Sequence, residues 1–466
     1  MSLDIETNTP ASHLLYGLED KPGFGNSTLA AVQHILASLV GIVTPSLIIG
    51  GALGLGQYIP YLISMSLFVS GLATFIQSQR VGPVGSGLLS LQGTSFAFLG
   101  AILAAGFAAK GRGDSPEQIL ALIFGLCLVG SLIEIVLSRF IDKLEGIITP
   151  TVTGIVITVI GLSLVKVGFT DMAGGFGAKD FGALPNLGLA MLVVAVIVGF
   201  SFARHDGIRL SAVLIGLLVG FAVAFLVGKV DFSKIGSQPL FAVPEPLKFG
   251  LAFDWSLFLP IAFIYLITAI ETTGDLTANS IISGQPVKGP VYIQRIKGGI
   301  LGDGVNSGLA ALFNTFPNTT FSQNNGVIQL TGVASRHVGI HISVLLVLLG
   351  LFPGFGAIFT LIPKPVLGGA TLVLFGSIAV AGIRILSSQH IDRKAIYVMA
   401  VSFGLGLGVS LVPDALKGLP DILQKVLGSP ITVSGLAAIL LTLILPDTQP
   451  ETTPADEELE LPIAAS

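Results

Sequence analysis

Residues 316–336 read FPNTTFSQNNGVIQLTGVASR, and this stretch decides how the chain folds. Pro317 lacks a backbone donor and the Asn, Thr and Phe residues after it favour extended backbone, so the first half is not an ordinary membrane helix. Residues 323–326 then lead into an apolar helical run at 327–333. Asn-Asn-Gly is also a common surface turn, which is the alternative interpretation. Apolar segments close on both sides favour a break inside a membrane.

Such a break at mid-membrane depth is tolerated only where protein buries the open backbone or where it lines a cavity. In transporters the N-terminus of the half-helix is directed at the substrate. A second break lies at 91–109, where residues 92–98 (QGTSFAF) predict a short strand ahead of a helix. Sliding the chain by 225 residues places Thr94-Ser95-Phe96 on Thr319-Thr320-Phe321. Two breaks in corresponding halves indicate an inverted repeat.

The composition predicts an all-α polytopic membrane protein. Hydrophobic residues make up 52% of the 466 residues and charged residues only 11%, whereas a soluble protein carries about a quarter charged residues. Cys127 is the single cysteine, which excludes a disulfide framework or a thiolate metal site. The sequence has no metal-ligand spacing and no nucleophile–base set, so we expect neither an enzyme nor a cofactor. The net charge of −4 gives no reason to expect a nucleic-acid partner.

We predict fourteen membrane segments in two sets of seven, because an odd-numbered unit inverts its orientation when it is repeated. The first set is 28–53, 58–76, 91–109, 118–138, 146–167, 184–203 and 208–228. The second set is 255–280, 293–313, 319–333, 339–361, 366–386, 395–411 and 431–445. Every arginine except Arg112 then falls on a cytoplasmic connection, which places both termini in the cytoplasm of a cell-membrane protein.

Two carboxyl groups lie inside the first segment of the second half. Glu271 and Asp275 are spaced i, i+4 and therefore share one helix face. Ionisable residues inside spans are costly and are functional by default. Burial and a neighbouring like charge both favour the neutral form of at least one of the two, as a proton symporter requires. The alternative is that this segment ends at the cytoplasmic surface, where Asp275 is solvated.

Three further ionisable groups fall within predicted spans. Asp303 could pair with the Glu271 cluster, bind backbone donors, or lie in a turn of Gly302-Asp303-Gly304. His34 could bond across helices or carry a proton, although a structural histidine fits equally well. Glu134 lies near a span end and is interpreted as interfacial.

The expected site combines a carboxylate, a carboxamide and an aromatic ring. Glu271 can accept ring N–H groups, while Gln323 can both donate and accept, which matches a lactam edge. Phe98 can stack on a planar ring. This combination suits a flat, uncharged heterocycle better than an inorganic anion, which would require Arg or Lys in the site.

The run Gln323-Asn324-x-Gly326-x4-Thr331-Gly332 resembles the signature of the nucleobase–ascorbate transporters, also called the xanthine/uracil permease family. That signature reads [Gln/Glu/Pro]-Asn-x-Gly-x4-Thr-[Arg/Lys/Gly], and this chain matches every position. The resemblance extends to Gln33-His34, to residues 95–98, to Glu271-x3-Asp275 and to Gly302-Asp303-Gly304, and so covers the membrane region.

The resemblance implies core and gate domains within a seven-plus-seven inverted repeat, and a homodimer through the gate domains. The core would comprise 27–138 and 255–362, the gate 139–229 and 363–446, with an N-terminal tail at 1–26, an external loop at 230–254 and a disordered tail at 447–466.

It also implies a proton-coupled symporter that imports a purine nucleobase, xanthine or uric acid, by elevator-like alternating access. Uracil carriers usually have Glu where this chain has Gln323, and ascorbate carriers Pro. The implied substrate-binding residues are Glu271, Gln323, Phe98, Ala97, Ser322, Phe321 and Asn324, and the implied proton-coupling residues are Glu271, Asp275, Asp303 and His34. A uracil or other nucleobase permease is the alternative. An anion exchanger on the same architecture is less favoured, because no Lys or Arg lies near the start of either broken segment.

Overall fold

The computed structural model describes residues 14–141, 149–230, 241–388 and 391–446. Within these ranges, eight helices are long and apolar enough to cross a membrane, and α12 with α13 form a further apolar unit bent by 76°. The chain is therefore a multi-pass membrane protein. Four parts of the prediction lie outside the described residues: 1–13 of the N-terminal tail, the C-terminal tail at 447–466, 231–240 of the loop at 230–254, and the start of the segment predicted at 146.

The helices follow the predicted segments closely. The first half contains α1 (Phe24–Leu53), α2 (Ile59–Gln79), α3 (Leu99–Gly111), α4 (Pro116–Leu137), α5 (Pro150–Met172), α6 (Leu184–Ser201), α7 (Asp206–Leu210) and α8 (Ala212–Leu226). The second half contains α9 (Trp255–Ile282), α10 (Gly289–Leu312), α11 (Ser322–Thr331), α12 (Val338–Gly350), α13 (Pro353–Thr360), α14 (Lys364–Ser387), α15 (Arg393–Leu411), α16 (Asp421–Leu427) and α17 (Pro430–Ile444).

The helix starts follow from ordinary capping chemistry. Ser115 caps α4 in a reciprocal capping box with Gln118, and Pro116 occupies the first turn, where its missing N–H has no cost. Asp254 caps α9 by accepting from the backbone N–H of Ser256 at 2.8 Å. These side chains bond backbone donors that the helices themselves leave open.

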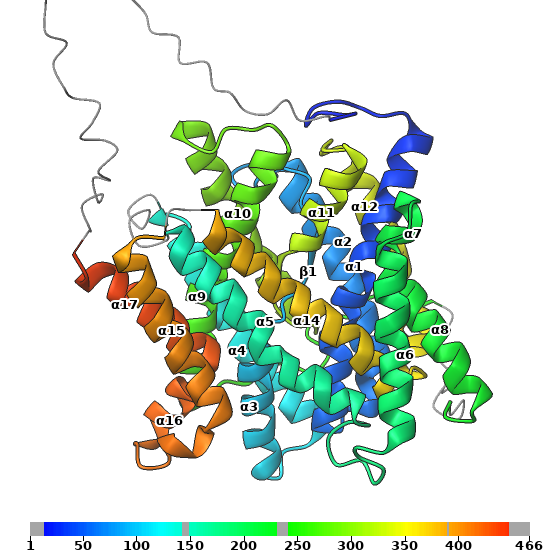
Figure 1. Ribbon diagram of the computed structural model, residues 1–466, viewed down its shortest axis with the longest axis vertical. Helices are drawn as coiled ribbons and strands as arrows, with labels where there is room; N and C mark the ends of the chain where they lie inside the picture. Colours follow the sequence, from blue (N-terminus) through cyan, green and yellow to red (C-terminus); the bar gives the residue numbers. More distant parts are fainter. Residues whose placement is uncertain (1–13, 142–148, 231–240, 389–390, 447–466) are drawn as a thin grey trace, which may run out of the picture.

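Two short strands lie at the centre of the bundle, as predicted for both broken segments. β1 (Gln92–Thr94) and β2 (Asn318–Thr320) pair antiparallel, with Gly93 opposite Thr319. Both strands are fully buried. Figure 1 shows β1 at mid-height, with α3 below it and α11 above it. The two half-helices therefore extend from the strand pair toward opposite ends of the helix bundle.

Three details of the prediction are wrong. α11 begins at Ser322 rather than at residue 327, so Gln323 lies in its first turn. The segment predicted at 339–361 is two helices, because Pro353 starts α13 after the chain turns by 76°. The segment predicted at 208–228 is likewise divided into α7 and α8 at Ser211.

The helices pack in two groups that meet along α9 and also where α1 contacts α8. One group contains α5, α6, α8, α14, α15 and α17, and the other contains α1 to α4 and α10 to α13. Glycines let backbones approach closely within each group. A Cβ atom at Gly161 of α5 would lie 2.3 Å from the backbone nitrogen of Ala379 in α14, and one at Gly71 of α2 would lie 2.7 Å from the carbonyl oxygen of Ser343 in α12.

Candidate functional site

The strand pair and the starts of α3 and α11 form the frame of the site. Pairing continues beyond the strands, because Ser95 N–H donates to the Pro317 carbonyl at 2.8 Å and Phe321 N–H donates to the Leu91 carbonyl at 3.1 Å. The first N–H groups of a helix have no partner within that helix. The peptides at Ala97 and Ser322, where each strand passes into its half-helix, therefore lie close to such open donors.

Asp275 joins α9 to the start of α11. The Ser322 hydroxyl donates to its Oδ1 at 2.6 Å, and the Thr320 hydroxyl donates to its Oδ2 at 3.1 Å. Asn325 Nδ2 also donates to the Asp275 backbone carbonyl at 3.1 Å. Asp275 is buried, so the alternative that it is solvated at a surface is wrong. These bonds explain why α11 starts at Ser322, since the polar residues of its first turn have partners on α9.

Asp303 is fully buried in the interior of α10, and no turn forms there. The hydroxyl of Thr272 on α9 donates to it in a short hydrogen bond, and the Thr319 hydroxyl of β2 lies 3.3 Å from the same Oδ2. Gln77 Nε2 on α2 lies 3.4 Å from Oδ1. Asp303 thus connects α10 to three neighbouring elements, α9, β2 and α2.

Glu271 lies one helical turn before Asp275 on α9. Its Oε2 atom is buried and has no hydrogen-bond partner among the described residues. A buried acceptor without a partner costs about 1–3 kcal/mol, so this oxygen is available to a ligand donor. Gln323 is half-buried and directly follows Ser322, which bonds to Asp275. No hydrogen bond links Gln323 to another described side chain. Glu271 Oε2 and the Gln323 carboxamide therefore both lack a side-chain partner, and the hydrogen bond between Ser322 and Asp275 joins the two helices beside them.

Two predicted binding residues hold the start of α11 in place. Asn324 is buried, and its Nδ2 donates to the Leu89 carbonyl at 2.7 Å. Phe321 is buried against the strand pair, where a Cβ at Gly93 would lie 2.4 Å from its ring. In this conformation both side chains position the backbone of α11.

The remaining predicted residues are buried close to the strands. Phe98 is 1% exposed, and its ring centroid lies 4.5 Å from that of Tyr265 on α9. Ala97 is also buried. His34 is fully buried on α1 and lies close to Asn324. Phe98 therefore packs against α9, whereas His34 lies beside the first turn of α11.

Glu134 was interpreted as interfacial, and this is wrong. It is 1% exposed on α4, and the hydroxyl of Thr268 on α9 donates to its Oε1 at 2.6 Å. Its Oε2 has no partner among the described residues. The sequence signal was the stripe of small and polar residues at Cys127, Gly130, Ser131 and Glu134, which faces α9 and α10.

The site therefore contains buried carboxyl groups at Glu134, Glu271, Asp275 and Asp303, three of them anchored by hydroxyl donors. Among the described residues, no Lys or Arg forms an ion pair or hydrogen bond with any of the four. Such carboxyl groups accept hydrogen bonds when they are ionised and can donate one when they are protonated.

A buried strand pair between two half-helices, inside a bundle of membrane-length helices, defines a membrane transport protein. The family model of the xanthine/uracil permeases, described as "Permease family", matches residues 25–415. The chain belongs to this family, the nucleobase–ascorbate transporters.

Relatives support the same assignment over most of the chain. "Xanthine permease XanP" of Escherichia coli K12 is 47% identical over 443 residues, which covers 94% of this chain and 96% of the relative. "Xanthine permease XanQ" of the same organism is 44% identical and covers 95% and 96%. The transmembrane domain of the cyanobacterial bicarbonate transporter BicA shares the fold, with a TM-score of 0.58, 18% identity, and coverage of 88% of this chain and 99% of that domain.

Proposed function

We propose that this protein is a proton-coupled symporter that imports xanthine, uric acid or both across the cell membrane. The relatives named as xanthine permeases support the substrate class. The observation that carries the proposal is the pair of uncommitted groups, Glu271 and Gln323, on either side of the Asp275–Ser322 hydrogen bond.

These two groups match the edge of a xanthine-type ring. The carboxylate of Glu271 accepts from ring N–H groups, and the carboxamide of Gln323 presents a donor and an acceptor to an adjacent carbonyl and N–H. The open backbone N–H groups near Ala97 and Ser322 donate to further ring carbonyls. Phe98 supplies an aromatic face once movement of the site brings it against the base.

Proton coupling follows from carboxyl groups that lack a cation. Burial favours the neutral form of such a group, and access from one side of the membrane at a time lets it take a proton on one side and release it on the other. Glu271 couples directly to ligand binding in this mechanism. Asp275 on α9 transmits the change to α11, Asp303 on α10 transmits it to α9 and β2, and His34 on α1 transmits it to Asn324 of α11.

The movement that we propose is an elevator of the core against the gate. The core comprises 27–138 and 255–362, and the gate comprises 139–229 and 363–446. The two helix groups meet along α9, which carries Glu271, so displacement of the core moves the site relative to α5 and α17. Both termini are cytoplasmic, and two copies associate through their gates.

Uptake of radiolabelled xanthine into proteoliposomes tests this proposal. We expect accumulation when the outside is acidic relative to the lumen, and loss of accumulation when a protonophore is added. Equal uptake with and without the gradient would refute proton coupling. Competition by uracil that exceeds competition by xanthine and uric acid would instead support the alternative of a uracil permease.

A further inference from the structure

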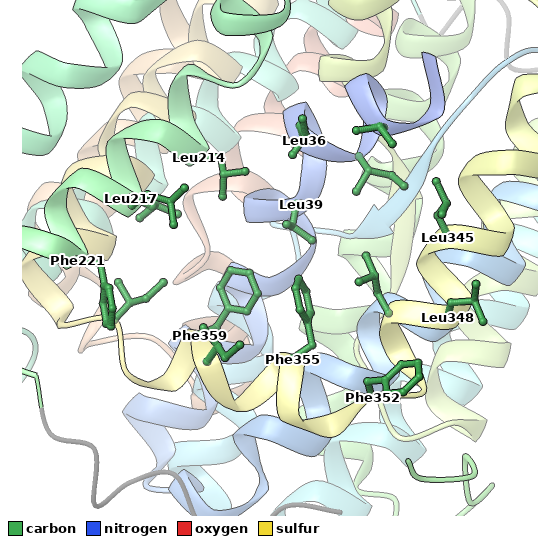
Figure 2. A pocket seen from close by; sticks show the side chains of 16 residues that line it. Leu36, Leu39, Leu214, Leu217, Phe221, Leu345, Leu348, Phe352, Phe355 and Phe359 are labelled. Atoms are coloured by element: carbon green, nitrogen blue, oxygen red, sulfur yellow. The ribbon is translucent and has the colours of Figure 1, made fainter. Parts of the chain in front are cut away.

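An apolar groove of about 570 Å³ lies between α8 on one side and α1, α12 and α13 on the other. All sixteen side chains that line it are Val, Leu, Ile or Phe. Figure 2 shows Phe355 and Phe359 on α13 directed into the groove, toward Leu39 of α1 and Leu217 of α8. The groove therefore lies at a junction between the two helix groups and away from the carboxyl groups of the candidate site.

The groove opens onto the outer surface of the helix bundle. At its base, Leu39 is 5% exposed, Leu217 2% and Phe359 6%. At its rim, Leu218 is 59% exposed, Leu348 47% and Ile358 54%. The exposure increases from base to rim across helices that lie in a membrane. The medium at the rim is therefore the hydrocarbon of the bilayer.

The chemistry of the wall selects the occupant. A buried water requires two to four polar partners, and these side chains offer none. An empty groove would leave its lining without dispersion contacts on one side. A loop of polypeptide would bring backbone N–H and C=O groups to a wall that cannot bond them. A hydrocarbon chain requires no hydrogen bond and is already present at the rim.

We propose that the acyl chain of a membrane phospholipid occupies this groove and forms part of the packing between α8 and the α1–α12–α13 unit. The bend of 76° between α12 and α13 creates the site, because α13 turns across the end of the groove and closes it with Phe355 and Phe359. A straight continuation of α12 would leave the groove without this floor.

Quenching by brominated acyl chains tests the proposal in the full-length protein. Trp255 is the only tryptophan, so Trp255→Phe gives a background without indole fluorescence. Phe359→Trp then places a probe at the base of the groove. Leu218→Trp at the rim is the positive control, and Phe124→Trp is the negative control because Phe124 is fully buried away from the groove. Each variant is reconstituted in phosphatidylcholine with and without bromine on the acyl chain.

We expect brominated lipid to quench Phe359→Trp at least half as strongly as Leu218→Trp, and to leave Phe124→Trp nearly unquenched. Phe355→Trp provides a second probe at the base if Phe359→Trp does not fold. Quenching of the base probes by aqueous acrylamide instead would show a hydrated groove and overturn the proposal. Base probes that escape both quenchers would also overturn it. In that case, emission that changes with the protein-to-lipid ratio would identify a second copy as the occupant, and constant emission would indicate that α8 closes against α12.

Discussion

Replacement of Gln323 by Glu tests whether the carboxamide of this residue recognises the purine ring by hydrogen bonding. The change removes the N–H donor of the carboxamide and places a second acceptor against the ring carbonyl. The fold should tolerate it, because Gln323 is half-buried and makes no hydrogen bond to another described side chain. The binding free energy of xanthine should fall, because each buried polar group left unpaired costs about 1–3 kcal/mol. A loss of this size would raise the half-saturation constant for xanthine roughly 5- to 150-fold.

The assay is competition uptake with xanthine, uric acid, uracil and guanine at one acidic and one alkaline pH. The protonated form of the introduced carboxyl group would donate as the amide does, so we expect xanthine uptake by Gln323→Glu to recover at the acidic pH. Gln329→Glu is the matched control, because Gln329 is exposed on the same helix. If Gln323→Glu keeps the ligand ranking of the parent at both pH values, Gln323 does not read the base and the purine assignment loses its physical support.

Three further predictions concern the carboxylate, the ring and a helix cap. Glu271→Gln should abolish gradient-driven accumulation, because an amide cannot exchange a proton; near-normal accumulation in the uptake assay would remove Glu271 from the mechanism. If the Phe98 ring stacks on the base, Phe98→Ala should weaken xanthine binding by roughly 0.5–1.5 kcal/mol in addition to the energy of the buried area that is lost. An unchanged half-saturation constant with a lower melting temperature would instead show that the ring only packs against Tyr265. Hydrogen bonds from Ser256 and Arg112 lower the pKa of Asp254 from 3.8 to about 2, so its capping contribution is complete above pH 3.8 and is lost as the pH falls through about 2. Asp254→Ala should therefore destabilise the protein by about 1 kcal/mol at neutral pH, and the difference in thermal unfolding from the parent should shrink toward pH 2.

The local features of the fold could be predicted because local chemistry determines them. Pro317 and the β-branched residues after it mark the second strand whatever surrounds them, and the apolar runs mark the helices. The start of α11 depends instead on Asp275, a residue of another helix that gives Ser322 and Asn325 their hydrogen bonds. No periodicity within residues 316–336 carries that information.

The burial of Glu134 shows the same limit. Its hydroxyl partner, Thr268, lies on α9, and the two residues are far apart in the sequence. Position near the end of a span suggested an interface, but tertiary packing decided the environment. Pro353 was a visible signal for the bend after α12, yet the long apolar run concealed it. The groove beside α13 is a property of four helices together and has no counterpart in any single segment.

The pairing of β1 with β2 also restricts how the protein can be made. The two strands lie in opposite halves of the chain, so the ribosome completes the first long before the second exists. Until β2 arrives, the backbone groups of Gln92 to Thr94 have no partner strand in a hydrocarbon medium that supplies none. The first half of the protein therefore cannot mature alone. A chain truncated before Asn318 should remain bound to the insertion machinery or be degraded, and the two halves should become stable only as one unit.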